Sequence, residues 1–239
     1  MTESEPAPDP APGECLGATQ FIDSDAAGVR DFAARTVAGQ DDATGKAVAL
    51  YYAVRDGIVY DPYDVELSEV GFRASRCLAR GRGFCITKAA LLAAVARASG
   101  IPARLGFADV RNHLATERLR RLMGGTDIFY YHGYTELFLE GRWVKATPAF
   151  NIGLCERFRV RPLEFDGRSD SIFHPFDADN RRHMEYVAER GTFADLPFRA
   201  IRENFRRNYP ALMREGAPGG DFAAEAEAEA GRDAPRAKH

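Results

Sequence analysis

The sequence has no long hydrophobic run and almost no excess of charge, and each absence excludes a class of protein. No apolar stretch reaches the about 20 residues that a membrane-spanning helix needs. The N-terminus is acidic and rich in proline, whereas a secretory signal would be basic and then apolar. A balance of 32 Lys and Arg against 35 Asp and Glu leaves a net charge of −3, which offers no basic surface for nucleic acid or for an anionic membrane. We therefore expect a soluble, cytoplasmic protein that binds neither nucleic acid nor a membrane.

Paired cysteines are also absent. The four cysteines, Cys15, Cys77, Cys85 and Cys155, form no Cys-x-x-Cys pair, so the sequence suggests neither a zinc ribbon nor a disulfide framework. A zinc site with Cys85 and His132 as two ligands would lack a second close pair of ligands. The Gly-Arg-Gly-Phe segment at 81–84 has neither the lysine nor the preceding strand of a phosphate-binding loop. We therefore expect no metal and no organic cofactor.

What the sequence does contain is enough apolar material for a substantial core, since 45% of its 239 residues are hydrophobic. Its two ends differ from the rest. Residues 1–16 are acidic and proline-rich, and residues 216–239 alternate Ala and Glu without an apolar face that could dock. We interpret both ends as disordered tails, which leaves residues 17–215 as one domain.

The period of the apolar residues changes along this domain. Helical spacing dominates the first half and strand alternation the second, where a hairpin is expected around Glu140 and Gly141. The predicted helices are 22–36, 47–58, 85–99, 181–189 and 200–207, and the predicted strands are 103–107, 128–139 and 143–147. A helical half followed by a strand half indicates an α+β fold.

One segment has a chemical signature. Gly81 and Gly83 permit a tight turn into the helix 85–99, and they set Cys85 at its N-terminus. Unpaired backbone N–H groups and the positive end of the helix dipole favour a thiolate there and lower a thiol pKa. Taken alone, Cys85 is as well explained by a buried cysteine that begins a helix.

His132 is the best placed histidine to act on such a thiol. Strand alternation puts it on one face with Tyr130, Tyr134 and Glu136. With Glu140 and Gly141 as the turn, Phe138 faces Trp143 and Glu136 forms an ion pair with Lys145.

The same register has consequences closer to His132. It sets Tyr134 opposite Thr147 and Ala149 opposite His132, with Thr147 and Asn151 as the diagonal neighbours of the histidine. The other histidines are less informative. We interpret the segment around His113 as a solvated loop, and His174 and His183, which lack metal-ligand spacing, as surface residues.

Three segments together resemble the core of the transglutaminase-like superfamily, whose members are cysteine enzymes related in geometry to papain-like proteases. They are KAVALYYAVRDGIVYDPY, the run GRGFC through LLAAVARASGIPARL, and YHGYTELFLEGRWVKATP, and the resemblance covers about residues 18 to 151. It implies an α+β, papain/transglutaminase-like fold in which the cysteine helix packs on an antiparallel sheet. It also implies that Cys85 is the nucleophile and His132 its base.

The sequence departs from the family at the third residue of the catalytic triad. An aspartate usually precedes the proline after the hairpin, whereas this chain has Thr147 before Pro148. A threonine hydroxyl can fix the imidazole tautomer but supplies no charge. Asn151 could orient His132 instead, as an asparagine does in papain-like enzymes. Asp109 and Asp166 are more distant candidates.

These features predict thiol-dependent acyl transfer on a peptide or protein amide, through a Cys85 thioester. Water as the acceptor would make the enzyme a cysteine protease or amidase, and therefore a hydrolase. An amine as the acceptor would make it an acyltransferase of the transglutaminase type. The competing hypothesis is a catalytically impaired scaffold that acts as a binding module, and Thr147 is the residue that favours it. The sequence does not indicate the oligomeric state.

Overall fold

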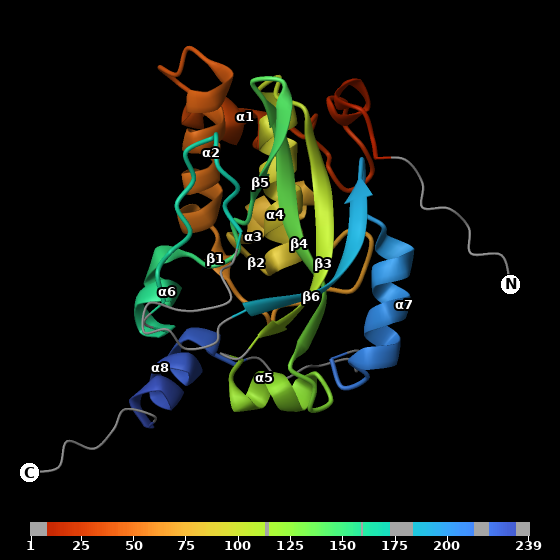
Figure 1. Cartoon of the computed structure of the whole chain (residues 1–239), viewed down its shortest axis with the longest axis vertical. Coiled ribbons are helices and arrows are strands. Elements are labelled where there is room, and N and C mark those ends of the chain that lie inside the picture. The colour runs from red at the N-terminus through yellow and green to blue at the C-terminus, as the bar shows by residue number, and fades with distance from the viewer. Residues whose placement is uncertain (1–8, 113–114, 159, 173–183, 213–219, 233–239) are drawn as a thin grey trace, which may run out of the picture.

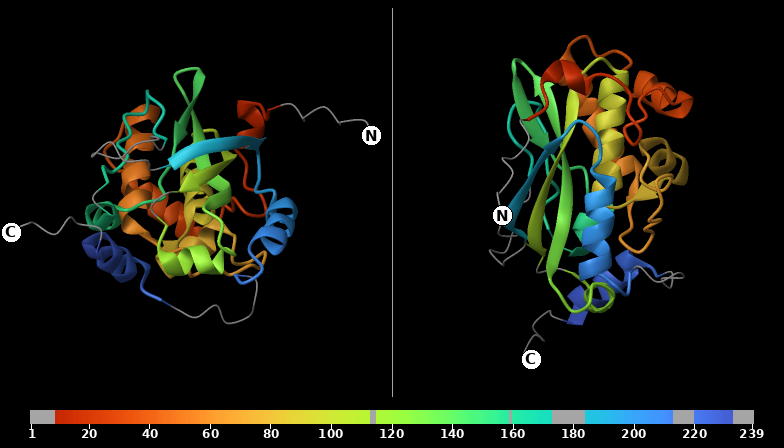
Figure 2. Two further views of the ribbon diagram at one scale, coloured as in Figure 1. Left: turned by 60° about the horizontal axis from the view of Figure 1, so that its bottom comes forward. Right: turned by 90° about the vertical axis from the view of Figure 1, so that its right-hand side faces the viewer.

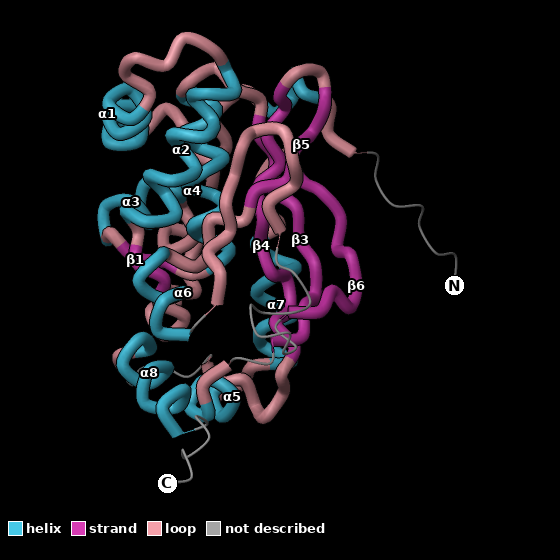
Figure 3. Tube along the Cα trace, turned by 60° about the vertical axis from the view of Figure 1, so that its left-hand side comes forward, coloured by secondary structure: helices cyan, strands magenta, loops and turns pink. Residues whose placement is uncertain are grey.

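The molecule has two layers, a sheet on one side and helices on the other. The computed structural model describes residues 9–112, 115–158, 160–172, 184–212 and 220–232. Figure 1 labels the elements, and Figure 3 shows the four-stranded sheet of β3 to β6 on one side and helices α1 to α4 on the other. The elements are η1 (Pro12–Cys15), α1 (Ala27–Thr36), α2 (Ala43–Gly57), β1 (Val59–Tyr60), α3 (Ala74–Arg80), β2 (Arg82–Gly83), α4 (Cys85–Ala98), β3 (Ala103–Asn112), α5 (Glu117–Leu122), β4 (Ile128–Leu139), β5 (Arg142–Ala146), α6 (Ile152–Phe158), β6 (Met184–Phe193), α7 (Phe198–Asn208) and α8 (Phe222–Arg232).

Helix α4 is the centre of the fold. Every residue from Cys85 to Arg97 is buried, because α4 packs on β3 and β4 on one side and on α1, α2 and α3 on the other. The side view in Figure 2 shows α4 lying between the sheet and the outer helices. A helix enclosed in this way needs no polar face, which explains its run of Ala, Leu and Val.

The sheet is antiparallel with the strand order β5-β4-β3-β6. Its hairpin turns at Glu140 and Gly141, both with positive φ (49° and 83°), and this sets Phe138 opposite Trp143 and Glu136 opposite Lys145. The α+β class is confirmed, and so is the predicted register from Thr135 opposite Ala146 to Leu139 opposite Arg142. The predicted position of Ala149 opposite His132 is wrong, because the β4–β5 ladder ends at Ala146. Within the described residues, none of the helices is both long and apolar enough to cross a membrane.

The predicted ion pair between Glu136 and Lys145 is wrong. Glu136 instead accepts a hydrogen bond from Arg104 of β3 at 2.6 Å, and both side chains are buried. The Lys145 ammonium lies over the ring of Tyr134, 5.0 Å from its centroid. Arg104 and Lys145 both lie directly across from Glu136, in the β3–β4 and β4–β5 ladders, and the buried Arg104 takes the carboxylate.

The predicted helix 181–189 is also wrong. Residues 184–193 form strand β6, which pairs with β3 from Leu105 to Asn112, while residues 181–183 lie outside the described part of the chain. Glu, Ala and Arg favour a helix here. The unsatisfied backbone groups of β3 decide otherwise, since pairing with a sheet edge outweighs such weak local preferences.

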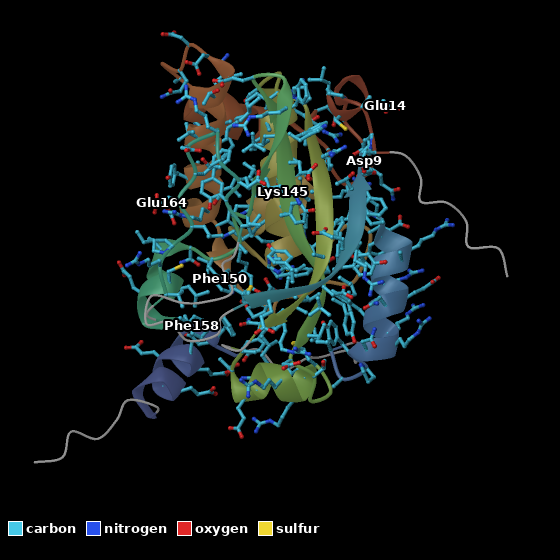
Figure 4. All side chains as sticks on the ribbon, viewed as in Figure 1. Asp9, Glu14, Lys145, Phe150, Phe158 and Glu164 are labelled. Atoms are coloured by element: carbon cyan, nitrogen blue, oxygen red, sulfur yellow. The ribbon has the colours of Figure 1, made fainter. Side chains whose placement is uncertain are left out.

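Both predicted tails are ordered in their described parts. At the N-terminal end Cys15 is fully buried, and Asp9 accepts a hydrogen bond from Thr192 of β6 at 2.6 Å. Figure 4 shows Asp9 and Glu14 beside the end of the sheet. Arg104 also donates to the carbonyl of Pro10, so this segment covers charged groups that the sheet would otherwise leave partly exposed.

At the other end, residues 222–232 form α8, which docks through Phe222 and Ala226. Phe222 packs against Tyr60, Tyr63 and Phe158. The prediction missed this helix because its apolar contact depends on one aromatic residue that precedes the Ala-Glu repeat.

Candidate active site

Cys85 lies at the first turn of α4, and two local devices place it there. Gly81 ends α3 in the left-handed region, with a φ of 62°. Gly83 is required for a different reason, because a Cβ at this position would lie 2.8 Å from the Cys77 sulfur and 2.5 Å from the Thr87 hydroxyl. That hydroxyl accepts the backbone N–H of Phe84 at 3.1 Å, which caps the helix just before Cys85.

Strand β4 approaches the start of α4 most closely at Gly133. A Cβ on this glycine would lie 3.1 Å from the Cα of Ile86, so any larger residue would push the strand away from the helix. The backbone N–H groups of Gly133 and Ile86 lie close enough to the Cys85 sulfur to lower the pKa of its thiol. The thiol therefore lies against the main chain of the residue that follows His132.

His132 is buried, with 1% of its surface exposed, and lies where strand β4 is irregular. The β3–β4 register shifts between Ala108 and Val110, and Tyr131 has a positive φ of 55°. The Asp109 carboxylate supports this bulge because it accepts the backbone N–H of Tyr131 at 3.1 Å and pairs with Arg190. Asp109 thus shapes the strand beside His132, and its carboxylate is engaged by groups other than the imidazole.

The two residues predicted to orient His132 lie in different surroundings. Strand β5 ends at Ala146, and the backbone N–H of Thr147 donates to Ser171, so the predicted pairing of Thr147 with Tyr134 does not form. The Thr147 hydroxyl is buried and has no hydrogen-bond partner among the described residues.

Asn151 lies further along the chain and contacts β1. Its side-chain Oδ1 accepts the backbone N–H of Tyr60 at 3.1 Å. Asp166, the most distant candidate, accepts the backbone N–H groups of Arg168 and Ser169 in its own turn. His113, His174 and His183 lie outside the described residues. No three His, Cys, Asp or Glu side chains gather as possible metal ligands in the described part of the chain.

The pKa of the Cys85 thiol differs from the sequence-based expectation. Burial raises it to about 11, although the backbone hydrogen bonds of Gly133, Ile86 and Cys85 itself lower it. The expected depression by the helix N-terminus is therefore outweighed by the loss of hydration. Burial likewise raises the pKa of Cys77 and of Cys155 to about 11, so proton affinity does not set Cys85 apart from these two thiols.

What sets Cys85 apart is an apolar pocket in whose wall it lies. The pocket is lined by Tyr60, Pro62, Val65, Phe84, Cys85, Leu119, Met123, Phe129, Tyr130, Phe205, Tyr209 and Leu212. Most of this wall was missed from the sequence because α5, α7 and the segment after β1 contribute to it from distant positions. The apolar face of 198–208 was the one available signal, and it does not indicate which surface that helix covers.

Residues 30–148 match the model of the Transglutaminase-like superfamily, and this segment includes Cys85, His132 and Thr147. The chain belongs to the transglutaminase-like superfamily through this segment. No curated protein matches the chain.

Two solved structures are similar to parts of it. A protein from Cytophaga hutchinsonii, described as a putative cysteine protease, is 17% identical with a TM-score of 0.45, covering 78% of this chain and 55% of its own. A protein from Parabacteroides distasonis, described as a putative protease, is 15% identical with a TM-score of 0.36, covering 50% of this chain and 22% of its own. The chain thus spans about half of the first protein and less of the second.

Proposed function

We propose that this protein is a cysteine-dependent enzyme that transfers the acyl group of a peptide or protein amide, with Cys85 as the nucleophile and His132 as its base. The observation that carries the proposal is the position of Cys85, at the start of a buried helix and in the wall of a pocket. The backbone of Gly133, next to His132, contacts its sulfur. Cys77 and Cys155 are buried thiols of the same pKa that do not line this pocket.

The raised pKa determines how the thiol would be activated. A thiol with a pKa of about 11 stays protonated at neutral pH, so His132 would remove its proton during the attack rather than hold a thiolate beforehand. The sulfur then bonds to the amide carbonyl carbon, and the carbonyl oxygen becomes an oxyanion. When the C–N bond breaks, the imidazolium returns the proton to the leaving amine, and a thioester remains on Cys85.

The oxyanion needs hydrogen-bond donors at the N-terminus of α4. The backbone N–H of Cys85 is one, because a helix leaves its first N–H groups without intrahelical partners. The Tyr60 hydroxyl is a second candidate: Tyr60 lines the same pocket, and its hydroxyl forms no hydrogen bond with the described residues. Burial raises the pKa of Tyr60, and the neighbouring Cys85 adds to the rise, so the phenol stays protonated and can donate.

Of the two candidates for orienting His132, Thr147 is the one whose side chain is not engaged elsewhere, and its hydroxyl would have to turn to the imidazole, to which it does not bond in this structure. Its hydroxyl is buried without a partner, so both of its lone pairs remain available to an imidazole N–H. The Asn151 carbonyl oxygen is already engaged by Tyr60, which gives Asn151 an indirect part in the site through β1. An uncharged orienting group predicts a weaker base than the family aspartate would provide.

Thioester cleavage by water is the favoured second step, which makes a protease or amidase the leading proposal and a transglutaminase the alternative. The second hypothesis remains a scaffold without catalysis. It gains support from the missing carboxylate at Thr147, and it predicts a partner whose binding survives replacement of Cys85.

The rate of iodoacetamide alkylation tests the proposed pair. Because Cys77, Cys85 and Cys155 have the same raised pKa, any excess rate at Cys85 reports access through the pocket and assistance by His132. Peptide mass spectrometry would give the rate at each thiol in the wild type and in His132→Ala. We expect Cys85 to react fastest in the wild type and to lose most of that advantage in the variant. Equal rates at Cys85 in both proteins would reject the pair and favour the scaffold.

A further inference from the structure

The pocket beside Cys85 is unusual in its chemistry, because no charged residue and no amide side chain lines it. Its walls come from several elements, with Leu119 and Met123 from α5 and its end, and Phe205 and Tyr209 from α7 and its end. Leu119 and Met123 are each 2% exposed, so they form a closed wall rather than a flexible rim.

Tyr209, which also lines the pocket, adds no free polar group. The Tyr209 hydroxyl donates to the carbonyl of Ile128 at 2.7 Å and accepts the backbone N–H of Tyr130 at 2.7 Å. Burial raises its pKa further, so it stays neutral. The Tyr60 hydroxyl is the exception, and the proposed mechanism assigns it to the oxyanion. Elsewhere in the pocket a polar group would lose its water and find few partners, at a cost of about 1–3 kcal/mol.

We propose that this pocket binds the group attached to the reacting carbonyl, and that the enzyme prefers amides whose acyl part carries a branched aliphatic side chain. This inference rests on the proposed function and names its substrate class. The acyl group stays bonded to the Cys85 sulfur through both half-reactions, while the amine must leave and water must replace it. An apolar enclosure suits the part that stays and opposes the approach of water, so the acyl side is its occupant.

The same reasoning disfavours the side-chain amide of glutamine as the donor. A glutamine donor would bring only its two methylene groups to the pocket, followed by the polar peptide backbone. Apolar contact is worth about 25 cal/mol for each Å² removed from water, and a glutamine donor would forgo most of it.

A matched pair of substrates tests the preference. Leucine and asparagine side chains have the same branched shape and differ in polarity, so the aminomethylcoumarin amides of N-acetyl-leucine and N-acetyl-asparagine isolate the apolar contribution. We expect kcat/KM for the leucine amide to exceed that for the asparagine amide by about tenfold or more. Equal values would overturn the inference while leaving thiol-dependent acyl transfer supported by the turnover itself.

Two leucine variants link the preference to the pocket. Leu119 lines it, whereas Leu154 of α6 is equally buried, at 2% exposure, and does not. We expect Leu119→Ala to lower the leucine-to-asparagine ratio severalfold and Leu154→Ala to leave it unchanged. Thermal melting would establish that both variants fold. A ratio that changes equally in both, or in neither, would place the selectivity elsewhere.

A second measurement does not depend on turnover. N-acetyl-leucine amide should slow the alkylation of Cys85 by iodoacetamide more than N-acetyl-asparagine amide does, with Cys155 as the internal control. Protection by the leucine compound without turnover of any substrate would support the pocket and reject the proposed catalysis. Equal protection by both compounds would overturn the pocket inference.

Discussion

Lys88 is the most unusual charged residue in the core, and its titration gives a quantitative prediction. It is fully buried on α4, one turn after Cys85, and its Nζ donates to the carbonyls of Arg55 and Ile58 at 2.9 and 2.6 Å. These carbonyls lie at the end of α2, so Lys88 joins the cysteine helix to the segment that leads into β1. Burial lowers the Lys88 pKa from 10.5 to about 7.

The sign of the pH dependence follows from this shift. Between pH 7 and pH 10.5 the unfolded chain keeps the Lys88 proton and the folded protein releases it, so Lys88 makes the free energy of unfolding rise with pH. The slope approaches about 1.4 kcal/mol per pH unit once the folded amine is neutral. Since that amine is half-protonated near pH 7, the gain from pH 7 to pH 9 is about 2 kcal/mol.

The buried cysteines make the free energy of unfolding fall with pH, which is the opposite of the Lys88 effect. The reason is that burial raises the pKa of Cys77, Cys85 and Cys155 from 9.0 to about 11. Their stabilising contribution is complete below pH 9 and is lost as the pH rises from 9 to 11. Comparison of the wild type with Lys88→Met cancels the thiols, because both proteins contain them. We expect the difference in unfolding free energy between the two proteins to grow by about 2 kcal/mol from pH 7 to pH 9.

Urea unfolding followed by the fluorescence of Trp143, the single tryptophan, measures this difference. Lys46→Met on α2 is the matched control for the loss of a lysine, since Lys46 is only half-buried. A difference for Lys88→Met that stays constant within about 0.5 kcal/mol would refute the assignment of a neutral buried amine.

Three further predictions concern the site. Thr147→Val should lower kcat about tenfold or more if the hydroxyl orients the base, whereas Thr147→Ser should retain most of it. Tyr60→Phe should lower kcat about 100-fold. Adding Asn151→Ala to that variant should lower kcat little further, because Asn151 acts through Tyr60, and additive losses in the double variant would contradict that link. Gly133→Ala would set a Cβ 3.1 Å from the Cα of Ile86, and should lower the unfolding free energy by about 1–3 kcal/mol and slow alkylation at the active thiol, as urea melts and mass spectrometry would show.

Local patterns predicted the framework well because each rests on short-range physics. The run CITKAALLAAVARAS predicts α4 from helix propensity and ends near Gly100, and the structure confirms it. The Glu140–Gly141 turn fixes the β4–β5 register, so the pairing of Phe138 with Trp143 follows from counting along the chain. The resemblance predicted the family and the fold, and the family comparison confirms it.

Predictions that depended on a distant partner were less successful. The Glu136 side chain has two candidate cations, and only the position of β3 decides that Arg104 takes it. Residues 184–193 have helix-forming composition, but the edge of β3 makes them a strand. Helix α8 docks because Phe222 meets three aromatic side chains from separate parts of the chain.

For the candidate site, the sequence by itself determined which side chains are proposed as its reactive groups. Two glycines and a helix signal predict where Cys85 stands, and the hairpin predicts the strand that carries His132. The tertiary structure decided their environment: burial raises the thiol pKa to about 11, Asn151 contacts Tyr60, and α5 and α7 close an apolar pocket around the sulfur. The reason is physical, because helix starts and turns are local properties of the chain, whereas desolvation and pocket walls arise only when distant segments pack together.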